Sequence, residues 1–276
     1  MRRGRRIVAV AILAVASLPA ATPMQVLLQT LPREAESFSR CAVQLYSKET
    51  ITHMDLSAKG RSRTLKSDYS FVQMRDATGA IREVRQMREV DGKPVKAGSS
   101  TLEAVAQAYA EGSDKQKRRQ LEQLAKYGIR GAAADLGQML LMFAAPSLPG
   151  YEFRYTGEER APSGGAAMLA FAFSPIDALD KGLVVFQPGS KGGVQKPRFK
   201  GVVWIRKQDS RLARIALDSE AIAGQRQRLI VDYEPSAACS SVMPVAALHR
   251  ELEANGETLV ENKYVYERFR PLAENK

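Results

Sequence analysis

Two histidines, His53 and His249, are the only imidazole groups in the chain, and each lies in a segment with a β-strand pattern. A serine or cysteine hydrolase needs a general base beside its nucleophile, so either imidazole is a candidate for that role. Neither histidine is accompanied by a GxSxG motif, and the sequence has no HExxH or CxxC zinc motif. We therefore predict no enzyme activity, no metal site and no cofactor. A hydrolase around His249 or His53 is the enzymatic alternative.

The chain has two cysteines, Cys41 and Cys239. In an oxidising compartment such a pair favours one disulfide, which here would join the start of the first strand region to the loop before the last hairpin. Two separate buried thiols are the alternative. Because neither cysteine belongs to a CxxC pair, we do not expect a redox-active or zinc-binding role.

The N-terminal residues have the order of a Sec-type export signal. Four arginines at positions 2, 3, 5 and 6 precede an apolar run over 7–15, and small residues follow up to Ala21. An ordinary buried N-terminal helix is the alternative. No cysteine stands where lipidation would need one, so the sequence predicts a signal peptide over 1–21, a single domain over 22–276, and a periplasmic or secreted location.

A basic balance remains after the predicted signal, because the four arginines leave 37 basic against 30 acidic residues, a net charge of +7. Outside the cytoplasm, positive charge favours anionic lipid head groups as partners over nucleic acid, and it also serves solubility. The densest basic stretch contains Lys115, Lys117, Arg118 and Arg119. We expect a helix face there that either contacts an anionic membrane surface or is only solvated.

Strand patterns surround a helical middle region. A short helix is expected over 23–39, interrupted at Pro32, and further helices are expected between 100 and 128 and over 131–145. Strands are expected at 42–54, 69–74, 81–90, 151–156, 166–173, 183–187, 199–206, 211–218, 226–233, 245–252 and 258–269. Without regular βαβ alternation, this order predicts the α+β class with a large antiparallel sheet.

Two short turns fix expected strand registers. Asp91-Gly92 and Asn255-Gly256 are both signals for two-residue hairpin turns, since their residues tolerate positive φ. The second turn predicts three facing pairs, which are Ala254 with Glu257, Leu252 with Leu259, and Arg250 with Glu261.

The stretch from Gly201 to Ile215, GVVWIRKQDSRLARI, consists of a strand pattern ending near Trp204-Ile205, a polar turn containing Asp209, and a second strand pattern. It resembles the central hairpin of LolA-type periplasmic lipoprotein carriers, and the likeness extends to the preceding helices and to Val231-Asp-Tyr233. The resemblance implies a curved antiparallel sheet, a half-barrel, whose concave apolar face is covered by helices and accommodates acyl chains.

The predicted helix over 131–145 is apolar nearly all round, so we expect it to cover the concave face. Side chains that would line a groove between sheet and helices are Phe71, Met139, Leu140, Phe143, Phe153, Phe171, Phe173, Trp204 and Tyr233. We therefore predict an envelope protein that binds a lipid or a lipoprotein acyl chain there. The alternative is a scaffold or partner-binding module with a solid core, for which the same aromatic residues would fill the interior.

Overall fold

The computed structural model describes residues 21–275, except for 58–59, 75–79, 96–101, 103–104, 107–109, 111–120, 134, 161–164, 177–197 and 222–223. Within this part of the chain, most strands belong to one antiparallel sheet with the order β4-β3-β2-β1-β11-β10-β9-β8-β7-β6-β5, and β12 pairs with β1. Their bounds are β1 Leu45–Asp55, β2 Arg61–Gln73, β3 Ile81–Val90, β4 Lys93–Pro94, β5 Tyr151–Arg160, β6 Ala167–Pro175, β7 Phe199–Arg206, β8 Leu212–Ser219, β9 Gln225–Pro235, β10 Val242–Glu253, β11 Thr258–Tyr266 and β12 Arg270–Pro271. The predicted α+β class is confirmed.

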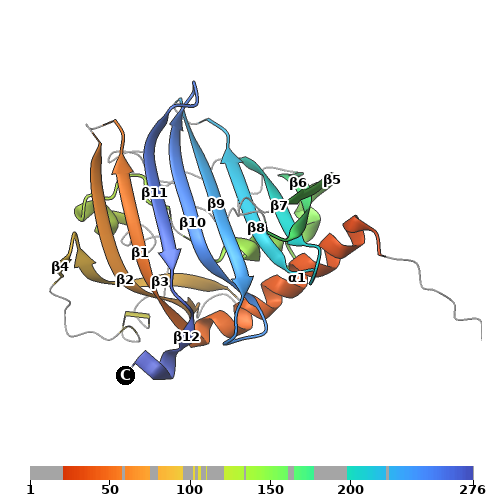
Figure 1. Cartoon of the computed structure of the whole chain (residues 1–276), viewed down its shortest axis with the longest axis horizontal. Coiled ribbons are helices and arrows are strands. Elements are labelled where there is room, and N and C mark those ends of the chain that lie inside the picture. The colour runs from red at the N-terminus through yellow and green to blue at the C-terminus, as the bar shows by residue number, and fades with distance from the viewer. Residues whose placement is uncertain are drawn as a thin grey trace, which may run out of the picture.

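The sheet curves, and residues 121–150 lie on the side toward which its two ends bend (Figure 1). The face on this side is called the inner face, and it carries alternate residues such as Ile51, Tyr69, Val231 and Phe171, all fully buried in one core cluster. β1 pairs with β11, so the first and last long strands meet in the middle of the sheet.

Helix α1, Pro23–Cys41, runs across the lower ends of the strands in the view of Figure 1. It begins with a capping box in which the Thr22 hydroxyl accepts from the Gln25 backbone N–H and the Gln25 side chain accepts from the Thr22 N–H. The predicted interruption at Pro32 is wrong, because the helix continues through it. A proline removes only one intrahelical bond, here to the carbonyl of the exposed Leu28 on the solvent side, while Leu27 and Leu31 are buried and hold both halves in place.

The predicted helix over 131–145 is also wrong in form. Its regular part is a short 3₁₀ helix, η2, Met139–Phe143, followed by η3, Leu148–Gly150. Gly131 and Asp135 have φ of +62° and +63°, in the left-handed region, and such values end an α-helix. The expected burial is confirmed, since Leu136, Met139 and Phe143 are fully buried.

Among the described residues of the middle region, 121–126 are helical. Gly128 follows them, and its φ of +87° matches the expected C-terminal glycine. The other 3₁₀ helices are η1, Ala42–Gln44, and η4, Leu272–Asn275. No helix among the described residues is long and apolar enough to cross a membrane.

The two predicted hairpins have different outcomes. Asp91 and Gly92 both have positive φ and join the paired residues Val90 and Lys93, as predicted. At the other hairpin, Arg250 faces Glu261 as predicted, but Leu252 faces Thr258 instead of Leu259. The cause is a β-bulge that shifts the register between Glu251 and Leu252.

Several predictions lie outside the described residues. These are residues 1–20 of the predicted signal peptide, the basic residues Lys115, Lys117, Arg118 and Arg119, and the strand over 183–187.

The disulfide between Cys41 and Cys239 is confirmed, with a sequence separation of 198 residues. Cys41 is the last residue of α1 rather than part of the first strand, and Cys239 lies in the connection from β9 to β10. The bond therefore ties the helix to the sheet.

Removing this disulfide should destabilise the fold, because a long closed loop greatly restricts the unfolded chain. We expect the Cys41→Ser/Cys239→Ser variant to lose about 3–5 kcal/mol in free energy of unfolding, measured by urea titration. Reductant should move the wild-type midpoint toward that of the variant and leave the variant unchanged. Equal midpoints for the two proteins would contradict this expectation.

Candidate functional site

Four of the predicted groove residues belong to two groups of aromatic rings within the core, and Trp204 lies apart from the core. Phe143, Phe153 and Phe173 form an aromatic cluster, with ring centroids 4.9 Å apart for Phe143 and Phe173. Phe71 belongs to a second cluster, with Phe38, Tyr69 and Phe269. The residues that are almost completely buried are Phe71, Met139, Leu140, Phe143, Phe171, Phe173 and Tyr233.

Trp204 is the outlier. It alternates along β7 with Val203 and Ile205, which are fully buried on the inner face, so its side chain lies on the outer face. There the indole Nε1 donates to Glu159 Oε2 at 2.8 Å. The structure therefore does not bring Trp204 together with the inner-face aromatics.

A buried ionic group occupies the inner face on β1, β2 and β3. Arg85 lies between two carboxylates, donating from Nε to Glu49 Oε2 at 2.8 Å and from Nη1 to Glu83 Oε2 at 3.0 Å. Burial alone would lower the Arg85 pKa, but Glu49 and Glu83 raise it well above its usual value. The Tyr69 hydroxyl donates to Glu83 Oε1 at 2.7 Å, and burial raises its pKa well above the ordinary range.

Glu83 also holds the chain that covers the inner face. We call residues 129–143 the crossing segment. Its backbone N–H groups at Asp135 and Gly137 donate to the Glu83 carboxylate at 3.0 and 2.5 Å. Tyr233 holds the same segment from β9, since its hydroxyl donates to the Gly137 carbonyl and accepts from the Leu140 N–H, both at 3.3 Å.

Asn262 holds the beginning of the crossing segment. Its Nδ2 donates to the carbonyls of Arg130 and Gly131 at 3.1 and 3.2 Å. This orientation makes Oδ1 the acceptor for His53 Nδ1 at 2.7 Å, so His53 carries its proton on Nδ1. The sequence patterns gave no sign of this role, because it depends on residues far apart in the chain.

His249 is also bound to amide groups. Its Nε2 hydrogen-bonds Gln227 Oε1, and its Nδ1 lies 3.4 Å from Asn262 Nδ2. Burial lowers the His249 pKa to about 3, although a hydrogen bond with the Gly131 backbone acts in the opposite direction. His53 and His249 thus both hydrogen-bond side-chain amides, whereas the hydrolase alternative requires a Ser or Cys nucleophile beside one of the imidazoles.

An open groove lies beside α1, with a volume of about 610 Å³. Its apolar lining includes Pro32 and Ala35 on the helix, Ile81 at the start of β3, Leu141 near the end of the crossing segment, and Ala144 directly after it. The full lining is Gln29, Pro32, Arg33, Ala35, Glu36, Ser39, Ala80, Ile81, Leu141, Ala144, Ala145 and Pro146. Sequence patterns did not indicate this groove, since its walls come from three separate parts of the chain.

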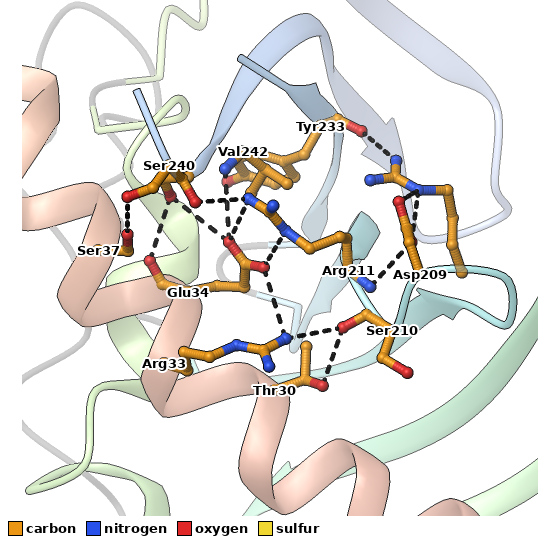
Figure 2. A network of polar contacts seen from close by, with 12 residues as sticks. Thr30, Arg33, Glu34, Ser37, Asp209, Ser210, Arg211, Tyr233, Ser240 and Val242 are labelled. Atoms are coloured by element: carbon orange, nitrogen blue, oxygen red, sulfur yellow. Dashed lines mark hydrogen bonds and ion pairs between the residues drawn. The ribbon is translucent and has the colours of Figure 1, made fainter. Parts of the chain in front are cut away.

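The other side of α1 is fixed by polar contacts (Figure 2). Glu34 is only 2% exposed, and its carboxylate forms an ion pair with Arg211 and accepts from the Val242 N–H at 3.4 Å. Thr30 adds a hydrogen bond from its hydroxyl to the Ser210 carbonyl at 3.0 Å. Together with the disulfide, these contacts hold the helix against the β7–β8 turn and the β9–β10 connection, which keeps one wall of the groove in place.

Three solved structures are similar to this chain over most of its length. A LolA superfamily protein from Nitrosomonas europaea has 10% identity and a TM-score of 0.36, covering 90% of this chain and 96% of its own. A DUF1329 family protein from Desulfovibrio piger has 12% identity and a TM-score of 0.35, covering 88% of this chain and 94% of its own. A domain described as an outer membrane lipoprotein-sorting protein, from Vibrio parahaemolyticus, has 12% identity and a TM-score of 0.35, covering 88% of this chain and 92% of its own. No family model and no curated protein matches the sequence.

Gly137→Ala should loosen the crossing segment. A Cβ at this position would lie 2.3 Å from the Tyr69 hydroxyl and 3.2 Å from Glu83 Oε1, so the segment would have to move away from the sheet. We expect a loss of about 2–3 kcal/mol in free energy of unfolding, measured by urea titration. In the Tyr69→Phe background, where the clashing oxygen is absent, the same change should cost clearly less. Equal costs in both backgrounds would refute this account.

His249 should make the protein sensitive to acid. The unfolded imidazole takes up a proton below about pH 6.5, whereas the folded one stays neutral down to about pH 3. Stability that is present above pH 6.5 should therefore be lost as the pH falls, by about 1 kcal/mol per unit. We expect His249→Gln to be less stable at neutral pH but to lose less stability between neutral pH and about pH 5. Identical losses in urea titrations of both proteins would rule out this role.

Proposed function

We propose that this protein is an extracytoplasmic carrier or binding protein that holds the acyl chain of a lipid or lipidated protein in the groove beside α1. The observation that carries the proposal is the groove itself, about 610 Å³ in volume, with an apolar lining that includes Pro32, Ala35, Ile81, Leu141 and Ala144. Sites for small apolar ligands have volumes of this order and linings of this kind.

The groove suits a flexible apolar chain better than a polar substrate. Burying each methylene of a ligand against such a lining contributes about 0.8 kcal/mol, so shape and apolar area are enough for binding. The polar lining residues, Gln29, Arg33, Glu36 and Ser39, all belong to α1 and follow one another along it. A ligand could therefore place its apolar part against Ile81 and Leu141 and keep its polar end beside the helix.

The inner-face residues enter the proposal as the support of the groove. Ile81 and Leu141 belong to or pack on the same apolar cluster as Phe71, Met139, Leu140, Phe143 and Phe173. We propose that these residues give the groove a firm apolar base and that the crossing segment, which covers the inner face, keeps the ligand beside α1.

The disulfide supports the proposed location. Cys41 and Cys239 are bonded, and such bonds persist in oxidising compartments such as the periplasm or the extracellular space. Acyl chains of envelope lipids are available there, so the proposed ligand and the proposed location agree.

Filling the groove should abolish ligand uptake without unfolding the protein. Ala144 is partly exposed in the groove wall, and Ala144→Trp places a bulky side chain in the space for the ligand. We expect the variant to lose binding of a fluorescent fatty acid and to lack the lipid that native mass spectrometry detects in the wild type.

The matched control is Ala246→Trp, because Ala246 is also partly exposed but lines a separate depression on the outer face. It should bind the fluorescent fatty acid like the wild type. A wild-type protein that takes up no lipid, or an Ala144→Trp variant that binds as well as the wild type, would overturn the proposed function.

A further inference from the structure

The groove beside α1 carries a charged side chain, Arg33, whose one carboxylate contact among the described residues is shared with a second arginine. Arg33 and Glu36 are the charged residues of the lining. Glu36 pairs with Arg40 at 3.2 Å, four residues further along the helix and outside the lining. Glu34, which Arg33 approaches only to 4.0 Å, is held by Arg211. Among the described residues, three guanidinium groups thus face two carboxylates, and the excess positive charge lies on Arg33.

We propose that Arg33 binds the anionic head group of a single-chain amphiphile whose apolar chain occupies the groove. This inference rests on the proposed function and names the class of ligand: a long-chain carboxylate or a phosphate monoester with one alkyl chain. A guanidinium group matches both head groups, because its planar N–H donors can bind two oxygens at once.

The position of Arg33 suits this role. Its Nη2 donates to the Ser210 carbonyl at 3.1 Å (Figure 2), and this bond restricts the orientation of a guanidinium group that belongs to the groove lining. The side chain remains 58% exposed, and the Nη1 and Nε donors take no part in that hydrogen bond. A preoriented guanidinium loses less conformational entropy when it binds a head group than a freely moving one.

Pro32 and Ala35 place the apolar lining directly next to this charge. Both lie on α1 within two residues of Arg33, so a head group at Arg33 leaves the attached chain at the apolar surface. A cationic head group would instead be repelled by the guanidinium group. An uncharged alcohol would leave the guanidinium group without a new partner.

The test compares ligands that share one alkyl chain and differ only in the head group. Dodecanoate, dodecyl phosphate, dodecanol and dodecylammonium are titrated into the wild-type protein below their micelle concentrations, and binding is measured by isothermal titration calorimetry. We expect at least one anionic ligand to bind about tenfold more tightly than dodecanol, and dodecylammonium to bind least. The carboxylate and phosphate titrations then show which anionic head group is preferred.

The variants assign this preference to one residue. Arg33→Gln should bring the affinity for the anionic ligands down to that for dodecanol, while leaving dodecanol binding unchanged. Arg33→Lys should retain part of the preference. Arg61→Gln removes an exposed arginine at the start of β2, outside the lining, and should keep the wild-type preference for anions. Thermal unfolding checks that the variants are folded. We expect them to be, because Thr30 still donates a hydrogen bond to the Ser210 carbonyl.

The outcomes separate this inference from the proposed function. Equal binding of anionic ligands by the wild type and Arg33→Gln, or equal binding of dodecanol and both anions by the wild type, overturns the role of Arg33 while acyl binding stands. If the wild type binds none of the four ligands, the proposed function fails together with the inference.

Discussion

Coverage of the inner face of the sheet is the constraint on which the rest of the structure depends. That face carries both apolar residues and buried charges, and buried charges are costly unless they are paired. Glu83 meets this requirement by joining Arg85 and Tyr69 on the sheet to the backbone N–H groups of Asp135 and Gly137. One carboxylate thus satisfies the sheet and fixes the segment that covers it. The space on the inner face of the sheet is consequently filled by side chains of the protein itself. The open groove lies outside this core, beside α1.

The two sides of helix α1 differ in their contacts. One side is fixed by the buried Glu34, its partner Arg211 and the disulfide to Cys239, so its position is determined by long-range contacts. The other side keeps the partly exposed Pro32 and the buried Ala35 in the lining of the groove. Rigid attachment on one side allows the opposite side to stay open, because the helix does not need to pack there to remain in place. A groove that is already formed requires no reorganisation before a ligand enters it.

The sequence predicted the local features well, because their signals are local. Asp91-Gly92 forms the expected turn, and most strands appear where alternating residues indicated them. The errors arose where distant contacts decide the conformation. Pro32 stays within α1 because its neighbours are buried, and the stretch over 131–145 follows hydrogen bonds to Glu83 and Asn262 instead of its helical pattern. Aromatic strand residues likewise could not reveal whether they line a space or fill one. The groove was not foreseeable, since its walls meet only in the folded protein.

The pairing of β1 with β11 has a consequence for the route of folding. Ile51 faces Tyr264, and such contacts between the two ends of the chain carry a high entropic cost of loop closure. The strands from β5 to β10 pair only with sequence neighbours, so this meander can assemble early and on its own. The strands β1 to β4 also pair with their sequence neighbours, so it is the joining of β1 to β11 that requires the last strands of the chain. Premature closure into a finished sheet is thereby prevented while the chain is still incomplete.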